Sequence, residues 1–307
     1  MIDILNRGSP IVLLALGQAL VIATGGVDLS VGAVMAVCGA VAACLIAQPD
    51  YSPLTGFVDP HGSLIIIVGI SLLVAVIAGL WNGVLVVGLG LQPIVATLVL
   101  MVAGRGLAQL FAGGQIVTFN HPGFSAIGRG TFIGLPMPVI IAIATAIVFG
   151  VLTRLTSLGL FLESSGNSPK AARMAGVPTA RVTIIAYAAC GLCAGIAGMI
   201  QTADINGGDA NNLGLYSELD AILAVSLGGT ALAGGRFSLA GAIAGAILIQ
   251  TLMTTINMTT IGGRAVDPAW TLVIKGAVVI AVCLLQSEAA RVAIRNAFKR
   301  KSAGGVA

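Results

Sequence analysis

Charged residues are scarce in this chain of 307 residues: only 8% are Asp, Glu, Lys or Arg, whereas a soluble domain carries about 25%. Hydrophobic residues make up 57% of the sequence. A soluble fold could not cover so much apolar surface with so few charged side chains. The composition therefore predicts an all-α, polytopic integral membrane protein. The net charge of +4 is interpreted as a signal of membrane orientation, not of nucleic-acid binding.

Groups that enzymes need are also scarce. The chain has two histidines, His61 and His121, both in predicted loops, so an intramembrane metal site is not expected. The sequence lacks the Gly-Lys-Ser/Thr loop that binds nucleotide phosphates, which excludes ATP hydrolysis by that route. The five cysteines lie inside apolar runs, and the pair Cys190 and Cys193 is interpreted as packing residues rather than a redox or metal pair. No catalytic residue, metal or cofactor is predicted.

Long apolar runs predict a single membrane domain over residues 1–290, followed by a basic tail at 291–307. Nine spans are expected, at 10–24, 29–47, 64–88, 93–112, 137–153, 180–203, 218–234, 238–258 and 268–287. The segments between them are a short polar lead at 1–9, a loop at 48–63 and a Gly/Pro-rich connection at 113–136. Asp28 precedes the second span and is expected to cap its N-terminus.

The distribution of cations predicts how the chain is oriented. Most of the fifteen Lys and Arg residues lie in the loop 154–181, near Arg236 and in the tail. The positive-inside rule places these regions, and with them the C-terminus, in the cytoplasm. With nine spans the same parity places residue 1 outside the cell. The complete protein is therefore expected to have one further N-terminal helix, giving ten spans with both ends in the cytoplasm.

Polar side chains within the spans are costly in lipid and usually face the bundle interior or a water-filled path. They are Gln18, Asn82, Gln92, Thr97, Arg105, Gln201, Asp204, Glu218, Asp220, Gln250, Asn257 and Lys275. The segment DINGGDANNLGLYSE at 204–218 combines carboxylates, amides and an aromatic ring, which suits a polyhydroxylated ligand. The alternative is a solvated extracellular loop. The predicted ligand path comprises Gln18, Asn82, Gln92, Arg105, Asn120, Asp204, Asp209, Asn211, Asn212, Tyr216, Glu218 and Asp220.

The basic loop 154–181 contains a short helix with clear boundary signals. Ser168 can cap its N-terminus, Pro169 suits the first helical position, and Gly176 can close the helix in a left-handed conformation. A helix this short is not stable alone in water. A partner surface is therefore expected to hold it, and the alternative is an ordinary basic loop with one helical turn.

Three segments resemble the permease subunits of bacterial ATP-binding-cassette (ABC) monosaccharide importers of the ribose/xylose/galactose group. They read ALGQALVIATGGVDLSVGAVMAV at 15–37, GNSPKAARMAGV at 166–177 and LDAILAVSLGGTALAGGRFS at 219–238. The resemblance covers nearly the whole chain. Within the group, GGQIVTFN at 113–120 and ADINGGDANNLGLYSELDAILAV at 203–225 look closest to the galactofuranose permeases.

The resemblance implies a sugar permease of the bacterial inner membrane that works by alternating access. Its implied partners are a cytoplasmic ABC ATPase subunit, a periplasmic sugar-binding protein and a second permease chain, identical or different. The loop would dock on the ATPase through Glu163, Asn167, Ser168, Lys170, Ala171, Ala172, Arg173 and Gly176. Ser164 and Ser165 depart from the more apolar residues expected there. The competing hypothesis is an ion-coupled secondary transporter or channel without an ATPase, which Asp28 at a helix break suggests.

Overall fold

The computed structural model describes residues 2–47 and 64–258 and, beyond these, only 260–261, 264–265 and a few single positions between 270 and 280. The chain divides into two units, Met1–Gln250 and Thr251–Ala307, and each is described by itself. Several predictions fall outside the described residues: the boundary at 290, the basic tail, Lys275, the side chain of Asn257 and, apart from those single positions, the span at 268–287.

Helices account for most of the described chain. They are α1 (Ile2–Ala23), α2 (Val31–Ile46), α3 (Leu64–Gly88), α4 (Pro93–Phe111), α5 (Pro122–Arg129), α6 (Met137–Leu155), α7 (Leu158–Asn167), α8 (Pro169–Met174), α9 (Thr179–Ile205), α10 (Ser217–Leu227) and α11 (Leu239–Met258). Short antiparallel pairs join β1 (Ile116–Thr118) to β4 (Gly207–Asp209), β2 (Thr131–Phe132) to β3 (Leu135–Pro136), and β5 (Thr260–Ile261) to β6 (Arg264–Ala265). The predicted helical membrane fold is confirmed, and the strands only tie connections together.

The predicted number of nine spans is not confirmed. Among the described residues, six helices are long and apolar enough to cross a membrane: α1, α3, α4, α6, α9 and α11 over Leu239–Ile256. A span needs about 20 residues, whereas α2 has 16 and α10 has 11. The span predicted at 218–234 ends at Leu227 because Gly228 and Gly229 follow, and Gly229 adopts a φ of +85° that closes the helix.

Two predicted connections contain helices. Residues 2–9 form the start of α1, where Asp3 lies in the favourable first turn and pairs with Arg7 at 3.3 Å. The connection at 113–136 contains α5, whose N-cap His121 accepts a hydrogen bond through Nδ1 from the backbone N–H of Phe124 at 3.0 Å. The sequence prediction missed α5 and the first turns of α1 because polar residues and glycines interrupt the apolar pattern there.

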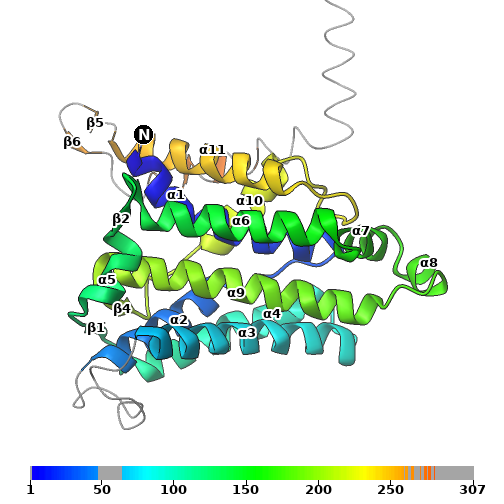
Figure 1. The fold of residues 1–307 in the computed structure, drawn as a ribbon, viewed down its shortest axis with the longest axis horizontal. Coiled ribbons are helices and arrows are strands. Elements are labelled where there is room, and N and C mark those ends of the chain that lie inside the picture. The colour runs from blue at the N-terminus through cyan, green and yellow to red at the C-terminus, as the bar shows by residue number, and fades with distance from the viewer. Residues whose placement is uncertain are drawn as a thin grey trace, which may run out of the picture. The chain divides into compact units, whose positions relative to one another are not determined.

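Helix α9 is the centre of the first unit. It contacts α1, α2, α3, α5 and α7, and Figure 1 shows it running between α1 and α6 on one side and α2, α3 and α4 on the other. Glycines permit this approach: a Cβ at Gly191 would meet the backbone of Ala75 and Gly79 in α3, and one at Gly198 would meet Met35 in α2. Small residues thus allow neighbouring helices to pack closely against α9.

The helices of the first unit place functional segments at two opposite ends. One end carries the start of α1 with α5, β1 and β4, and the other carries α7 and α8 (Figure 1). These are called the α5 end and the α8 end below. Each end contains a cavity that is lined by polar side chains.

Candidate functional site

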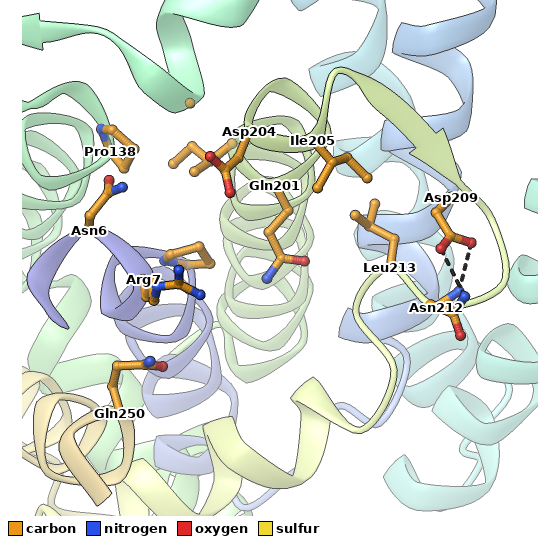
Figure 2. A pocket seen from close by; sticks show the side chains of 13 residues that line it. Asn6, Arg7, Pro138, Gln201, Asp204, Ile205, Asp209, Asn212, Leu213 and Gln250 are labelled. Carbon is orange, nitrogen blue, oxygen red and sulfur yellow. Dashed lines mark hydrogen bonds between the residues drawn. The ribbon is translucent and has the colours of Figure 1, made fainter. Parts of the chain in front are cut away.

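A cavity of about 390 Å³ lies at the α5 end, within the range of roughly 300–1,000 Å³ that is usual for small-molecule sites. It is called the α5-end cavity. Figure 2 shows that its polar side chains come from α1, α9, α11, β4 and the segment that follows β4. They are Asn6, Arg7, Gln201, Asp204, Asp209, Asn212 and Gln250. The fold thus gathers side chains from both ends of the first unit's sequence around one space.

The carboxylate of Asp209 forms its hydrogen bonds within its own turn of the chain. It accepts hydrogen bonds from the backbone N–H groups of Asn211 and Asn212, both at 3.0 Å, and from Nδ2 of Asn212 at 2.8 Å. Burial alone would raise the pKa of Asp209, but these hydrogen bonds and the charge of Arg105 lower that pKa below its ordinary value. Asp209 therefore stays charged and orders the wall of the cavity.

The other charged side chains of the cavity are ion-paired. Arg7 pairs with Asp3 within α1, and Asp204 pairs with Arg129 of α5 at 3.7 Å. These pairs are exposed, so each contributes little to stability. In each pair the opposite charges nevertheless neutralise each other. The cavity therefore offers a charged solute little net charge of the opposite sign.

Uncharged amides provide the remaining polar groups. Gln201 projects from α9 toward the middle of the α5-end cavity (Figure 2), and its amide has no hydrogen-bond partner among the described residues. The buried Oδ1 of Asn6 also lacks a partner among those residues. Gln250 comes from α11, which can approach α1 closely because Gly8 has no side chain there. Amide donors and acceptors of this kind match hydroxyl groups.

The predicted ligand path and this cavity overlap in part. Three predicted residues line the cavity: Asp204, Asp209 and Asn212. Asn211 lies beside them and accepts a hydrogen bond from Nε2 of Gln109 at 2.9 Å. Gln201 and Gln250 were identified only as polar residues within spans, and Asn6 and Arg7 were assigned to the short polar lead. Recognising that α1 begins before the apolar run would have revealed the last two.

Two predicted path residues, Gln18 and Asn82, lie instead in a buried cluster around Asp28. The Oδ1 atom of Asp28 accepts hydrogen bonds from N and Oγ of Ser30 at 2.8 and 2.6 Å and from Nδ2 of Asn82 at 3.3 Å. With its amide oriented to match its neighbours, Gln18 bonds to both N and O of Asp28, at 3.1 and 3.2 Å. The N-cap of α2 is Ser30, two residues after the predicted cap. Asp28 still accepts a hydrogen bond from the backbone N–H of Ser30 at the start of the helix, and its carboxylate also accepts one from Asn82.

Asn82→Leu is expected to lower the free energy of unfolding by about 1–3 kcal/mol, because it removes a donor from a buried carboxylate and a buried hydroxyl. Thermal melting of the purified chain in detergent measures the change. Asn120→Leu is the control, since Asn120 is exposed and makes no hydrogen bond to the described residues. Equal melting temperatures for the two variants would contradict the structural role of Asn82.

Arg105 holds the segment after β4 against α4. Its Nη1 donates hydrogen bonds to the carbonyl oxygens of Leu213 at 2.7 Å and Ala210 at 3.2 Å. The carboxylates of Glu218 and Asp209 lie close enough to interact with its charge. The remaining predicted path residues do not line the α5-end cavity: exposed Gln92, Asn120 and Tyr216, and buried Glu218 and Asp220.

At the α8 end, the predicted short helix is confirmed as α8. The Oγ atom of Ser168 accepts a hydrogen bond from the backbone N–H of Ala171 at 3.3 Å. At the other end Gly176 adopts a φ of +83°, and the N–H of Val177 returns to the carbonyl oxygen of Ala172 at 3.0 Å. This is the closing pattern that a left-handed glycine allows. The boundaries of α8 are thus set by local sequence.

The two faces of α8 differ sharply. Ala172 is only 5% exposed and packs within its own chain, whereas Met174 is 82% exposed. The side chains of Lys170, Ala171, Arg173 and Met174 are exposed. The predicted docking residues did not include Met174.

Helix α7 connects α8 to α1 through a backbone contact. The carbonyl oxygen of Ala23 accepts a hydrogen bond from the N–H of Gly235 at 3.0 Å. A Cβ at Gly166 would overlap that carbonyl oxygen, and the side chain of Asn167 lies against Gly235. These four residues are called the α1–α7 junction. Glu163 lies further back in α7 and lines a separate small cavity.

Comparison with known proteins places the chain among transport permeases. Residues 1–283 match the family model for the permease component of the branched-chain amino acid transport system. Galactofuranose transporter permease protein YtfT of Escherichia coli (strain K12) is 51% identical over 94% of this chain and 79% of its own length. Fructose import permease protein FruF of Bifidobacterium longum (strain NCC 2705) is 36% identical over 94% and 77%. Ribose import permease protein RbsC of Bacillus subtilis (strain 168) is 35% identical over 89% and 80%. No solved structure matches the chain.

Proposed function

Because this chain belongs to the family of transport permease components and is a permease of the ABC sugar importers, we propose that it carries galactofuranose across the bacterial inner membrane in an ATP-driven complex. The observation that carries the choice of sugar is the 51% identity, over 94% of the chain, to a galactofuranose permease. ATP hydrolysis belongs to a separate cytoplasmic subunit. A periplasmic binding protein delivers the sugar, and a second permease chain completes the membrane path.

The α5-end cavity supports a neutral, hydroxylated substrate. Its carboxylates are committed to Arg129 or to neighbouring amides, and the side chain of Gln201 remains available. Sugar hydroxyls both donate and accept hydrogen bonds, as amides do. A charged substrate would lose its hydration without gaining a matched counter-charge, which is unfavourable. In the proposed orientation this cavity faces the periplasm and receives the sugar.

The α8 end supports coupling to an ATPase. The exposed side chains of α8 form the contact, and the α1–α7 junction joins α7 to the end of α1. Helix α1 has 22 residues and so extends about 33 Å, with Asn6 and Arg7 at the α5-end cavity. Movement of the ATPase would therefore be transmitted along α1 to the sugar site, which opens alternately to either side.

The competing hypothesis, an ion-coupled transporter without an ATPase, depended on Asp28 at the helix break. The Oδ1 atom of Asp28 accepts hydrogen bonds from Ser30 and Asn82 within the chain. A coupling ion that bound this oxygen would have to displace these donors. The buried cluster is thus better suited to fixing the segment between α1 and α2 than to exchanging an ion.

Co-expression with the neighbouring genes, followed by uptake of radiolabelled galactofuranose, tests the proposal. An ATPase subunit should co-purify with this chain, and unlabelled ribose or fructose should compete poorly for uptake. Purification without any ATPase subunit would refute the coupling mechanism. Preferential uptake of ribose or fructose would refute the assigned sugar while leaving the coupling mechanism intact.

Gln201→Leu is expected to lower uptake about tenfold at limiting sugar, because the central uncharged amide of the cavity is lost while the side chain keeps a similar size. Gln92→Leu is the matched control, since Gln92 is exposed and does not line the α5-end cavity. Comparable uptake by the two variants, at equal amounts in the membrane, would exclude Gln201 from the sugar path.

A further inference from the structure

The α8 end contains a second cavity, of about 480 Å³, which is called the α8-end cavity. Its walls come from the segment after α1, the connection between α3 and α4, the loop that carries α8, and the start of α9. Arg173 is the one charged side chain among the described residues that line it, and no carboxylate lies among them. The cavity is therefore basic, in contrast to the charge-compensated cavity at the α5 end.

Hydroxyl groups follow one face of α9 along this cavity. Thr179, Thr183 and Tyr187 recur every fourth residue, so they share a helix face, and all three line the α8-end cavity. Tyr187 is fully buried, and its hydroxyl has no partner among the described residues. The hydroxyls of Thr179 and Thr183 likewise make no hydrogen bond to described parts of the chain.

The threonines of α6 behave differently. Thr145 donates to the carbonyl oxygen of Ile141 at 2.8 Å and Thr153 to that of Phe149 at 2.7 Å, the usual bond to the preceding helical turn. Thr183 lacks this bond to described residues although it lies well inside α9. Since buried polar groups are nearly always satisfied, the buried, unpartnered hydroxyl of Tyr187 beside this cavity favours a group that binds there.

A fourth such hydroxyl comes from α7. Ser165 lines the α8-end cavity and is 2% exposed, and its Oγ has no partner among the described residues. The unpartnered hydroxyls among the lining residues therefore come from two helices, α7 and α9. A bound group between α7 and α9 would satisfy both sides.

The start of α9 adds further donors. Pro178 occupies the N-cap and makes no side-chain bond to the helix end, so the first N–H groups of this 27-residue helix are not capped by that residue. Thr179 and Ala180, in the first turn, line the cavity. The N-terminus of a long helix carries a partial positive charge and binds anions well. Together with Arg173, it favours an anion with several acceptor oxygens.

We propose that the α8-end cavity binds a phosphate group, carried either by a phosphorylated solute or by a phospholipid headgroup. Arg173 supplies the charge, and the hydroxyl of Thr183 and the first N–H groups of α9 donate hydrogen bonds. Because Arg173 belongs to α8 and Thr183 to α9, the ligand joins the short helix to the bundle and restrains its movement. The site is distinct from the sugar site at the α5 end. Phosphate binding at this site does not depend on which sugar the chain transports.

The full chain, purified in detergent, tests binding of a soluble phosphate compound. Glucose 6-phosphate is titrated by calorimetry at constant ionic strength, with glucose plus sulfate as the reference. The lipid source is tested in parallel by native mass spectrometry of the chain from nanodiscs with phosphatidylglycerol or with phosphatidylcholine. Thr183→Val and Arg173→Gln are each expected to weaken binding at least about tenfold, as loss of a charge-assisted hydrogen bond does. Thr145→Val, whose hydroxyl is satisfied within α6, is expected to bind like the unmodified chain.

Each outcome decides the proposal. Binding of glucose 6-phosphate that is weakened by Thr183→Val identifies a phosphorylated solute, and retention of phosphatidylglycerol with the same sensitivity identifies a lipid headgroup. Absence of both, or equal binding by Thr183→Val and the unmodified chain, overturns it. If Arg173→Gln fails to fold, Tyr187→Phe and Thr183→Val, which preserve side-chain shape, carry the test alone. None of these measurements requires transport, so failure of the proposed sugar function would not affect them.

Discussion

Gly166→Ala is expected to lower the free energy of unfolding by about 3 kcal/mol and to abolish sugar uptake. Alanine normally stabilises a helix relative to glycine by roughly 0.5–1 kcal/mol. At Gly166 the added Cβ would overlap the carbonyl oxygen of Ala23, which already accepts a hydrogen bond from Gly235. Backbone atoms cannot move aside as a flexible side chain can, so the α1–α7 junction must open, and overpacking of this kind is costly.

Thermal melting of the purified chain and uptake in cells measure the two effects. Gly150→Ala is the matched control, because Gly150 is also helical and a Cβ there meets nothing within 4 Å. The control should melt at the same or a slightly higher temperature and should transport normally. If Gly166→Ala lowers the melting temperature while Gly150→Ala raises it, the destabilisation arises at the junction and not from the substitution of a helical glycine in general. Normal uptake by Gly166→Ala would remove the junction from the coupling path.

The sequence predicted the parts of this fold whose causes are local. Helices α3, α4, α6 and α9 lie within two residues of their predicted limits, because each is a long apolar run bounded by glycine, proline or polar residues. Helix α8 was predicted for a different local reason: Ser168 and Gly176 set its ends through their own hydrogen bonds and backbone angles. Hydropathy and capping act over a few residues, so one sequence suffices to identify them.

The parts of the fold and of the candidate site that the sequence did not predict depend on tertiary packing. The start of α1 is polar and reads as a loop, yet Asn6 and Arg7 are helical because the helix continues into a packed apolar segment. Asp28 carries the local signal of a cap, but the donors of Ser30 and Asn82 occupy its carboxylate. The α5-end cavity combines Asn6 with Gln250. No local pattern connects residues so far apart, and their shared role follows only from how the helices pack.

Met174→Asp is expected to weaken binding of the ATPase subunit at least about 30-fold, the effect of losing a hot spot worth 2 kcal/mol or more. Met174 is an 82% exposed apolar side chain beside the exposed cation Arg173. Methionine adapts its shape to a partner cleft, and the cations beside it favour an acidic rim. An aspartate would place a desolvated negative charge in the cleft and repel that rim, and ATP hydrolysis would then proceed without sugar transport.

Co-purification of the ATPase, and the ratio of sugar transported to ATP hydrolysed in proteoliposomes, measure the loss. Ile133→Asp is the control: Ile133 is 87% exposed at the α5 end and has a φ of 53°, a backbone conformation that aspartate tolerates better than isoleucine. It adds the same charge to an equally exposed apolar position away from α8, so ATPase binding should persist. If Met174→Asp also retained the ATPase, docking would depend on Lys170 and Arg173 alone, and the energy of coupling would be electrostatic and sensitive to salt.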